Sequence, residues 1–208
     1  MENIYNKFAG QSVERLAALS DGIFAFAMTL LVLDLRVPAA ELIRTDQDLW
    51  RGLVALSPQI IMYLMSFLTL GIFWIGQQTQ LNHLERSARS LSWMHLVFLF
   101  AVTLIPFSTH LLAEFSTYRI ALLFYWFNIA LLGGSLYLTW DCAIGLDLLK
   151  ADMPHGISEA IKRRVVVAQS LYACGALLCV FNTHWSIAFI VVAQLYYAIA
   201  PRIGRRKN

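Results

Sequence analysis

One apolar segment of the chain carries polar side chains that are costly inside a membrane. Between Arg15 and Asp34, Ser20 and Asp21 interrupt an otherwise apolar run, and Thr29 follows two turns later. A carboxylate inside a membrane span costs roughly 3 kcal/mol on insertion scales and therefore faces protein or water. Asp21 is thus a candidate for handling ions or protons, whereas Asp34 lies near the other end of the segment, where it can reach the interface.

A helical projection divides this segment into faces at about 100° per residue. One face, about 100° wide, is apolar apart from one glycine and one hydroxyl, and Asp21 lies outside it. This face, the apolar stripe, consists of Leu19, Gly22, Phe26, Thr29, Leu30 and Leu33. The stripe either packs on a neighbouring helix, with Gly22 allowing close approach, or meets copies of itself at an axis and forms a hydrophobic constriction. Periodicity alone leaves both interpretations open.

The sequence contains none of the motifs expected of a hydrolase, a nucleotide-driven pump or a classical potassium filter. It has no P-loop, GxSxG or HExxH motif, and it has no TVGYG segment. The five histidines lack metal-ligand spacing, and the three cysteines form no CxxC pair. We therefore expect no enzyme activity, no cofactor and no metal ion other than one that permeates. The net charge of +3 gives no indication of nucleic-acid binding.

The elements that position these residues follow from composition. Of the 208 residues, 59% are apolar and 14% are charged, against roughly 45–50% and about 25% in soluble domains. The apolar residues suffice for about six spans of ~20 residues, with little left for another domain. We predict an all-α integral membrane protein in which residues 1–208 form a single six-helix domain, with the pore helix first. The predicted spans are 16–37, 53–77, 91–112, 118–148, 165–181 and 185–200, with a kink at Pro106.

Lysine and arginine are distributed unequally over the two sides of these spans. Twelve lie in the N-terminal segment, the second-to-third loop, the fourth-to-fifth loop and the tail, and four lie on the opposite side. Positive residues concentrate on the cytoplasmic side. The sequence therefore predicts cytoplasmic N- and C-termini, which require an even number of spans, in a multi-pass protein of the cell inner (plasma) membrane.

The first span also carries a family signature. Arg15 precedes Ser20-Asp21, and the chain continues as Gly-x-Phe-Ala-x-Ala-x-Thr-Leu-Leu-Val-Leu. This segment resembles the first-helix signature of the endolysosomal potassium channel family, and most closely the bacterial single-repeat members of the transmembrane protein 175 family. Phe73-Trp74 and Leu104-Ile105-Pro106-Phe107 extend the resemblance into the next two spans. The second half of the chain resembles the family mainly by its number of spans.

The resemblance implies a passive, potassium-permeable cation channel that is lined by the first helix of each protomer. A single-repeat chain would assemble as a homotetramer in the lipid bilayer. The family's narrowest constriction corresponds to Phe26, Leu30 and Leu33 continue the apolar lining, and the hydroxyl linked to selectivity corresponds to Thr29. Phe26 departs from the usual Ile or Leu, and Leu19 replaces the signature phenylalanine.

The resemblance further implies a polar network around the pore helix. Relatives join arginine, aspartate and a histidine that follows the Phe-Trp pair, but this chain has Gln77 and Gln78 at that place. Arg15 and Asp21 are six residues apart, which is poor geometry for a direct pair on one helix. We therefore predict that Arg15, Ser20 and Asp21 are tied to the second span, with Gln77 as the bridge and a structural role.

Two other function classes are alternatives to a channel. A proton- or cation-coupled secondary transporter would use Asp21 and Asp141 as proton sites, with Gly133-Gly134 and Pro106 as points where helices break. No internal repeat between the two halves supports it. A non-conducting membrane scaffold would show no ion flux, and substitutions at Phe26 or Thr29 would leave that background unchanged.

Overall fold

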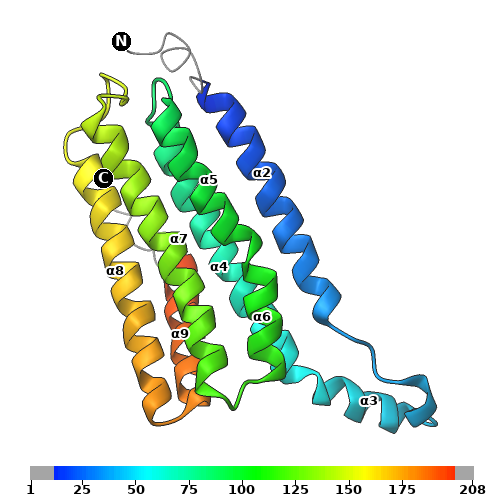
Figure 1. Ribbon diagram of the computed structural model, residues 1–208. Coiled ribbons are helices and arrows are strands. Elements are labelled where there is room, and N and C mark those ends of the chain that lie inside the picture. The colour runs from blue at the N-terminus through cyan, green and yellow to red at the C-terminus, as the bar shows by residue number, and fades with distance from the viewer. Residues whose placement is uncertain (1–11, 200–208) are drawn as a thin grey trace, which may run out of the picture.

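The computed structural model describes residues 12–199, which fold into a bundle of helices. Most of the helices run along one axis, and α2 lies at one edge of the bundle (Figure 1). The helices are α2 (Val13–Leu30), α3 (Asp46–Ala55), α4 (Ser57–Asn82), α5 (Arg89–Thr103), α6 (Ile105–Glu114), α7 (Arg119–Gly145), α8 (Ile157–Leu177) and α9 (Thr183–Ile199).

The first helix begins and ends at positions that its sequence explains. The Ser12 side chain accepts a hydrogen bond from the backbone N–H of Arg15 and caps α2. A 3-10 turn, Leu31–Asp34, extends the helix, and Leu35 is already extended. The first predicted span, 16–37, is therefore three residues too long at its C-terminal end, because a residue before proline, here Val37 before Pro38, is disfavoured in a helix.

Prolines divide two of the predicted spans. The third span is interrupted at Leu104, between α5 and α6, so the break expected at Pro106 is confirmed. Pro58 likewise stands in the first turn of α4, where its missing N–H is harmless. The predicted second span, 53–77, is displaced: residues 53–55 belong to α3, and α4 continues to Asn82. Its polar end stays helical because Gln77 and Gln80 are buried against other helices.

The short helix α3 lies outside the bundle and buries none of its residues. Figure 1 shows it projecting beyond α2, away from the other helices. Thr45 and Asp48 form a reciprocal cap at its start, and the hydrogen bond from the Thr45 hydroxyl holds the pKa of the Asp48 carboxyl below its ordinary value.

The last two helices differ in length from the predicted spans. The fifth span, predicted at 165–181, belongs to α8, which begins at Ile157 because Glu, Lys and Arg are good helix formers and prolong the apolar run. The sixth span, predicted at 185–200, corresponds to α9, which has 17 residues, and Ala200 lies outside the described residues. Within residues 12–199, five helical segments are long and apolar enough to cross a membrane: Val13–Asp34, Ser57–Asn82, Arg89–Glu114, Arg119–Gly145 and Ile157–Val180.

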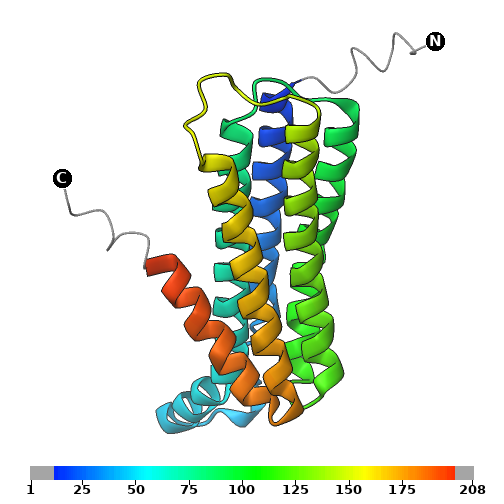
Figure 2. The same ribbon diagram turned by 90° about the vertical axis from the view of Figure 1, so that its left-hand side faces the viewer.

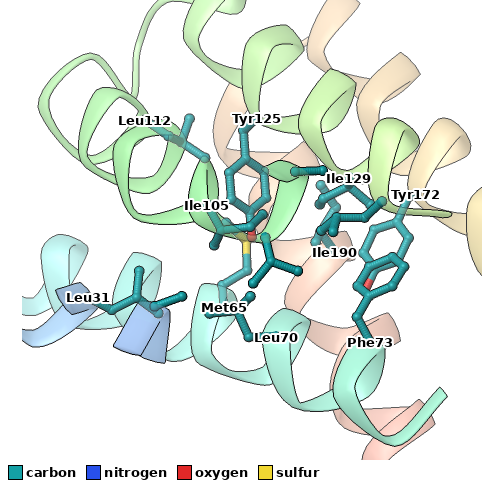
Figure 3. Close-up of a cluster of buried hydrophobic side chains, with 14 of the residues drawn as sticks. Leu31, Met65, Leu70, Phe73, Ile105, Leu112, Tyr125, Ile129, Tyr172 and Ile190 are labelled. Atoms are coloured by element: carbon teal, nitrogen blue, oxygen red, sulfur yellow. The ribbon is translucent and has the colours of Figure 1, made fainter. Parts of the chain in front are cut away.

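The centre of the bundle is filled by side chains from α4 to α9, and the first span contributes Phe24, Ala27 and Leu31. Figure 3 shows Leu31 beside the side chains of the other helices. Hydroxyl groups are hydrogen bonded within this core. The Tyr125 hydroxyl lies 3.1 Å from both Ser66 Oγ and Thr69 Oγ1, and Gln194 Nε2 donates to Thr69 Oγ1 at 2.6 Å. These hydroxyl groups are therefore paired with one another and with the Gln194 amide nitrogen among apolar side chains, whereas Gln194 Oε1 has no partner within residues 12–199.

Candidate functional site

The first helix is held to the bundle by one face only. Its buried side chains recur every three or four residues and pack against α4 and α5. Phe24 contacts Phe98 of α5, with ring centroids 5.9 Å apart. This anchoring face consists of Leu16, Ser20, Phe24, Ala27 and Leu31.

An inner polar cluster joins the anchoring face to two other helices. The Ser20 hydroxyl oxygen lies 2.7 Å from His95 Nε2 on α5, and it accepts a hydrogen bond from Gln77 Nε2 on α4 at 2.9 Å. The backbone oxygen of Leu16 lies 2.7 Å from the same hydroxyl oxygen. All three side chains are almost completely buried. One serine thus connects three helices where no water competes for its hydrogen bonds.

A second polar cluster lies at the edge of the same interface. Asp21 Oδ1 accepts hydrogen bonds from Trp74 Nε1 at 2.8 Å and from Gln78 Nε2 at 2.7 Å. Trp74 and Gln78 are four residues apart and therefore share a face of α4. The prediction that Gln77 bridges to Asp21 is wrong, because residue 77 is turned about 100° from residue 78 and faces the bundle interior.

Arg15 does not join either cluster. Its side chain is exposed, and within residues 12–199 it forms no ion pair with Asp21. The two residues lie about 9 Å apart along the helix axis, because each residue contributes 1.5 Å of rise. The predicted network is therefore split: Ser20 and Gln77 meet in one cluster, Asp21 belongs to another, and Arg15 stands apart.

His95 is the site residue that the sequence analysis missed. The second span has Gln77 and Gln78 where the resemblance places a histidine. The third span instead supplies an imidazole that contacts Ser20 and lies 3.4 Å from Gln77 Nε2. One signal was available: a histidine in the middle of the apolar run Leu91–Phe100 is a functional candidate by default.

The apolar stripe lies on the opposite side of α2 from the anchoring face. Phe26 is 66% exposed and Leu33 is 71% exposed, and Leu19 and Thr29 are exposed as well. A Cβ atom built at Gly22 meets nothing within 4 Å, and Leu30 is half-buried. Within the described part of the chain, the stripe is not covered by another helix of the same protomer. The interpretation that it packs inside the bundle is therefore wrong.

Thr29 is the one hydroxyl in the apolar stripe. Its Oγ1 donates a hydrogen bond to the backbone oxygen of Phe26 at 2.8 Å. Because the proton is directed to the helix backbone, the lone pairs of the oxygen remain available to a group outside the helix. An exposed hydroxyl with this geometry can act as an oxygen ligand for a cation.

The far end of the first span is attached to α6 by polar side chains. Asp34 Oδ1 lies 3.2 Å from His110 Nδ1, and both side chains are partly exposed. The pair forms an ion pair only when the imidazole is protonated. It gives the end of the pore-helix candidate a contact that is independent of the two clusters near Ser20 and Asp21.

The groups that a coupled transporter would need are not brought together. Asp141 forms an ion pair with Lys162 on α8, whereas the partners of Asp21 lie on α4. Gly133 and Gly134 lie inside α7, which is continuous, so the predicted break there is wrong. Gly133 instead allows close packing, because a Cβ atom at this position would clash with the Gln169 side chain.

Comparisons with known proteins agree on one family. The model of the family described as endosomal/lysosomal potassium channel TMEM175 matches residues 15–106, which include the apolar stripe and both polar clusters. A potassium channel from Streptomyces collinus is 39% identical over 101 residues, which are 49% of this chain and 48% of that protein. The chain thus aligns with about half of that relative.

Two further matches extend over nearly the whole chain. A potassium channel from Chamaesiphon minutus is 30% identical over 194 residues, covering 89% of this chain and 93% of that protein. The crystal structure of a lysosomal potassium-selective channel TMEM175 homolog from the same species superposes with a TM-score of 0.79 at 26% identity, covering 90% of this chain and 97% of that one.

Proposed function

The chain belongs to the TMEM175 family, and from this premise we propose that it is a passive, potassium-permeable cation channel. Its relatives are channels rather than enzymes. Potassium is the ion that the names of the bacterial relatives specify, whereas the vertebrate relatives are named proton channels. The proposed pathway runs along the apolar stripe of α2, with one such helix contributed by each of four identical protomers.

The observation that carries this proposal is the exposure of the apolar stripe on a helix whose other face is firmly attached. The core of the protomer is filled by side chains, so conduction through a single bundle is disfavoured. A homotetramer that buries the stripe at its axis would create a pathway between protomers. The same arrangement would cover Phe26 and Leu33, which are otherwise exposed.

The stripe supports a hydrophobic constriction with one oxygen ligand per protomer. Phe26, Leu30 and Leu33 extend about 10 Å along the helix. Potassium loses its hydration shell at lower cost than sodium does, so a narrow apolar neck without strong ligands favours potassium. Thr29, one turn from Phe26, would offer the permeating ion the lone pairs that its hydrogen bond to the backbone leaves available.

The polar clusters would keep the pore helix in register. Ser20, Gln77 and His95 fix its rotation on the inner side, and the hydrogen bonds to Asp21 fix it at the edge. We assign these residues a structural role. Arg15, exposed at the start of the same helix, lies on the side of Phe26 and would stand at the mouth of the pathway.

We further propose six membrane crossings with both termini in the cytoplasm, in the cell inner membrane. The excess of lysine and arginine at the end where α2 begins supports this orientation. With α9 as the sixth crossing, the number of crossings is even, as two termini on one side require.

Reconstitution into liposomes tests the function. A potassium gradient alone, without a proton gradient, should drive potassium flux. If flux instead requires a coupled proton or solute gradient, the protein is a transporter and the channel proposal fails. Flux at the level of protein-free liposomes would indicate a scaffold.

Cysteine modification tests the pathway. In a variant in which Cys142, Cys174 and Cys179 are replaced by alanine, Phe26→Cys should be blocked by a bulky thiol reagent and should form disulfide-linked protomer pairs on oxidation. The matched control is Phe100→Cys on α5, which is also an exposed phenylalanine and should be insensitive. Equal responses of the two variants would place the pathway elsewhere.

A further inference from the structure

A crevice separates the last two helices at one end of the bundle. Near their connection α8 and α9 are in close contact: Ser186 Oγ donates a hydrogen bond to the backbone oxygen of Gly175, and a Cβ atom at Gly175 would lie 2.8 Å from Ile190. Toward the beginning of α8, the two helices diverge (Figure 2). A cavity of about 720 Å³ lies at this wide end, lined by α8 residues and by Tyr197 of α9.

The wide end of the crevice is basic. Arg163 and Arg164 line it, both are exposed, and within residues 12–199 neither forms an ion pair. Lys162, their neighbour, is paired with Asp141 across the α7–α8 interface. Glu159 also lines the cavity, so the lining residues together carry a net charge of +1. The Glu159 carboxylate does not lie within ion-pair distance of Arg163.

The deeper part of the same crevice is apolar. Val167 lies one turn beyond the arginines on α8, and the half-buried Tyr197 lines the same cavity from α9, whereas Ala160 lies one turn nearer the opening. The crevice therefore has a cationic opening near the membrane surface and narrows along helices that run into the hydrocarbon region. This order of charge and apolar surface matches an amphiphile with an anionic head and a hydrocarbon chain.

We propose that this crevice binds an anionic phospholipid, with the headgroup phosphate on Arg163 and Arg164 and an acyl chain along Val167 and Tyr197. Basic pockets between membrane helices on the cytoplasmic side bind such headgroups. The crevice lies at the end where α2 begins and where the other basic loops lie, which is the proposed cytoplasmic side (Figure 2). A bound lipid would fill the space between α8 and α9 and hold the short last helix against the bundle.

Charge favours an anionic lipid over two other occupants of the crevice, namely the residues after α9 and a second copy of the chain. The residues after α9 include Arg202, Arg205, Arg206 and Lys207, which have the same sign as the crevice arginines and cannot neutralise them. A second copy of the chain docked on this face about a two-fold axis would present the same two arginines. An anionic lipid has the opposite sign and is available in the surrounding membrane.

Lipid binding to the purified full-length protein tests the proposal. Native mass spectrometry would be titrated with phosphatidylglycerol and with phosphatidylcholine of the same acyl chains. We expect the wild type to bind phosphatidylglycerol about tenfold more tightly or better, because each basic residue near an anionic headgroup strengthens binding by roughly fivefold. In Arg163→Gln/Arg164→Gln this preference should fall to about twofold or less.

A matched control removes two positive charges at the same end of the bundle but outside the crevice. Arg86→Gln/Lys150→Gln alters two exposed basic side chains outside the crevice and should keep the preference. Arg163→Lys/Arg164→Lys should keep most of it. Ala160→Trp keeps the charge but fills the cavity, and it should also lose the preference.

Three results would overturn the proposal. The first is an unchanged preference in both Arg163→Gln/Arg164→Gln and Ala160→Trp. The second is displacement of phosphatidylglycerol by excess inorganic phosphate, which would indicate a site for free anions. The third is a change in the number of protomers in Arg163→Gln/Arg164→Gln, which would indicate contact between copies. Potassium flux is measured separately, so failure of the lipid site and failure of the proposed channel can be distinguished.

Discussion

The two faces of α2 have similar apolar composition but opposite surroundings. The anchoring face ends in Leu31, which is completely buried, whereas the apolar stripe ends in Leu33, which is 71% exposed. On the anchoring face the Ser20 hydroxyl contacts side chains from two other helices. On the stripe the Thr29 hydroxyl bonds to its own helix backbone.

One helix therefore serves two purposes. Polar groups that connect helices fix the rotation of α2, because in an apolar medium an unpaired donor or acceptor is costly. A polar group that is satisfied within its own helix adds no such constraint and leaves its face available to ions or to another protomer.

Phe24→Ala should destabilise the protein by about 3 kcal/mol, because it leaves a cavity against Phe98 in the core. Phe26→Ala, a change of the same size on the exposed face, should alter the stability of the protomer by less than about 0.5 kcal/mol. Unfolding titrations in mixed micelles measure both values. Equal losses would mean that the two faces do not differ in packing.

Ser20→Ala should destabilise the protein by about 2 kcal/mol, since the Gln77 amide and the His95 ring lose a shared buried partner. The same unfolding titration applies. Thr29→Ala is the control: it also removes a hydroxyl from α2 and should be nearly neutral, because only a bond within the helix is lost. A neutral Ser20→Ala variant would contradict the anchoring role.

Phe26→Ala should raise potassium flux per reconstituted protomer by about tenfold, which corresponds to a barrier lower by roughly 1.4 kcal/mol. The reason is that the smaller side chain widens the proposed constriction. Liposome flux at matched protein content measures this. Phe100→Ala serves as the control on another exposed face, and an equal increase there would argue for general leakage.

Thr29→Val should reduce the preference for potassium over sodium by about threefold, or roughly 0.6 kcal/mol, because the side chain keeps its shape and loses its oxygen ligand. Thr29→Ser restores the oxygen and should retain the preference. Reversal potentials in a planar bilayer with mixed ions measure the ratio. If valine and serine behave alike, the hydroxyl does not contact the permeating ion.

Asp34→Asn should change stability by less than about 0.5 kcal/mol, because partly exposed ion pairs contribute little. Unfolding titrations of the wild type and the variant measure it. A loss of more than about 1 kcal/mol would assign Asp34 a role other than this pair.

Much of the fold could be predicted from the sequence. The interruption near Pro106 follows from local chemistry, because proline lacks an N–H whatever surrounds it. The start of the first helix was predicted three residues late, at Leu16 instead of Val13, because the Ser12 cap was not recognised. The boundaries at the charged ends could not be predicted from hydropathy. Four of the six residues 159–164 of α8 are charged, yet this segment is helical, because helix formation depends on backbone preference as well as on apolar content.

The candidate site was predicted only in part. The apolar stripe could be predicted because its residues recur with the 3.6-residue period of a helix within one continuous segment. The choice between Gln77 and Gln78 depends on how α4 is rotated about its own axis relative to α2. The contribution of His95 depends on a contact between residues 75 positions apart, and a single sequence gives no direct indication of either.

Five apolar spans, the break near Pro106 and the separation of Asp21 from the stripe follow from the sequence alone. All of these are properties of one segment and its local geometry. The tertiary structure decided which face of α2 is covered, which glutamine contacts Asp21 and which helix supplies the histidine. Those outcomes depend on how several helices pack together at once. Buried polar side chains such as Ser20 and His95 need partners on other helices, and the apolar side chains around them must fill the remaining space.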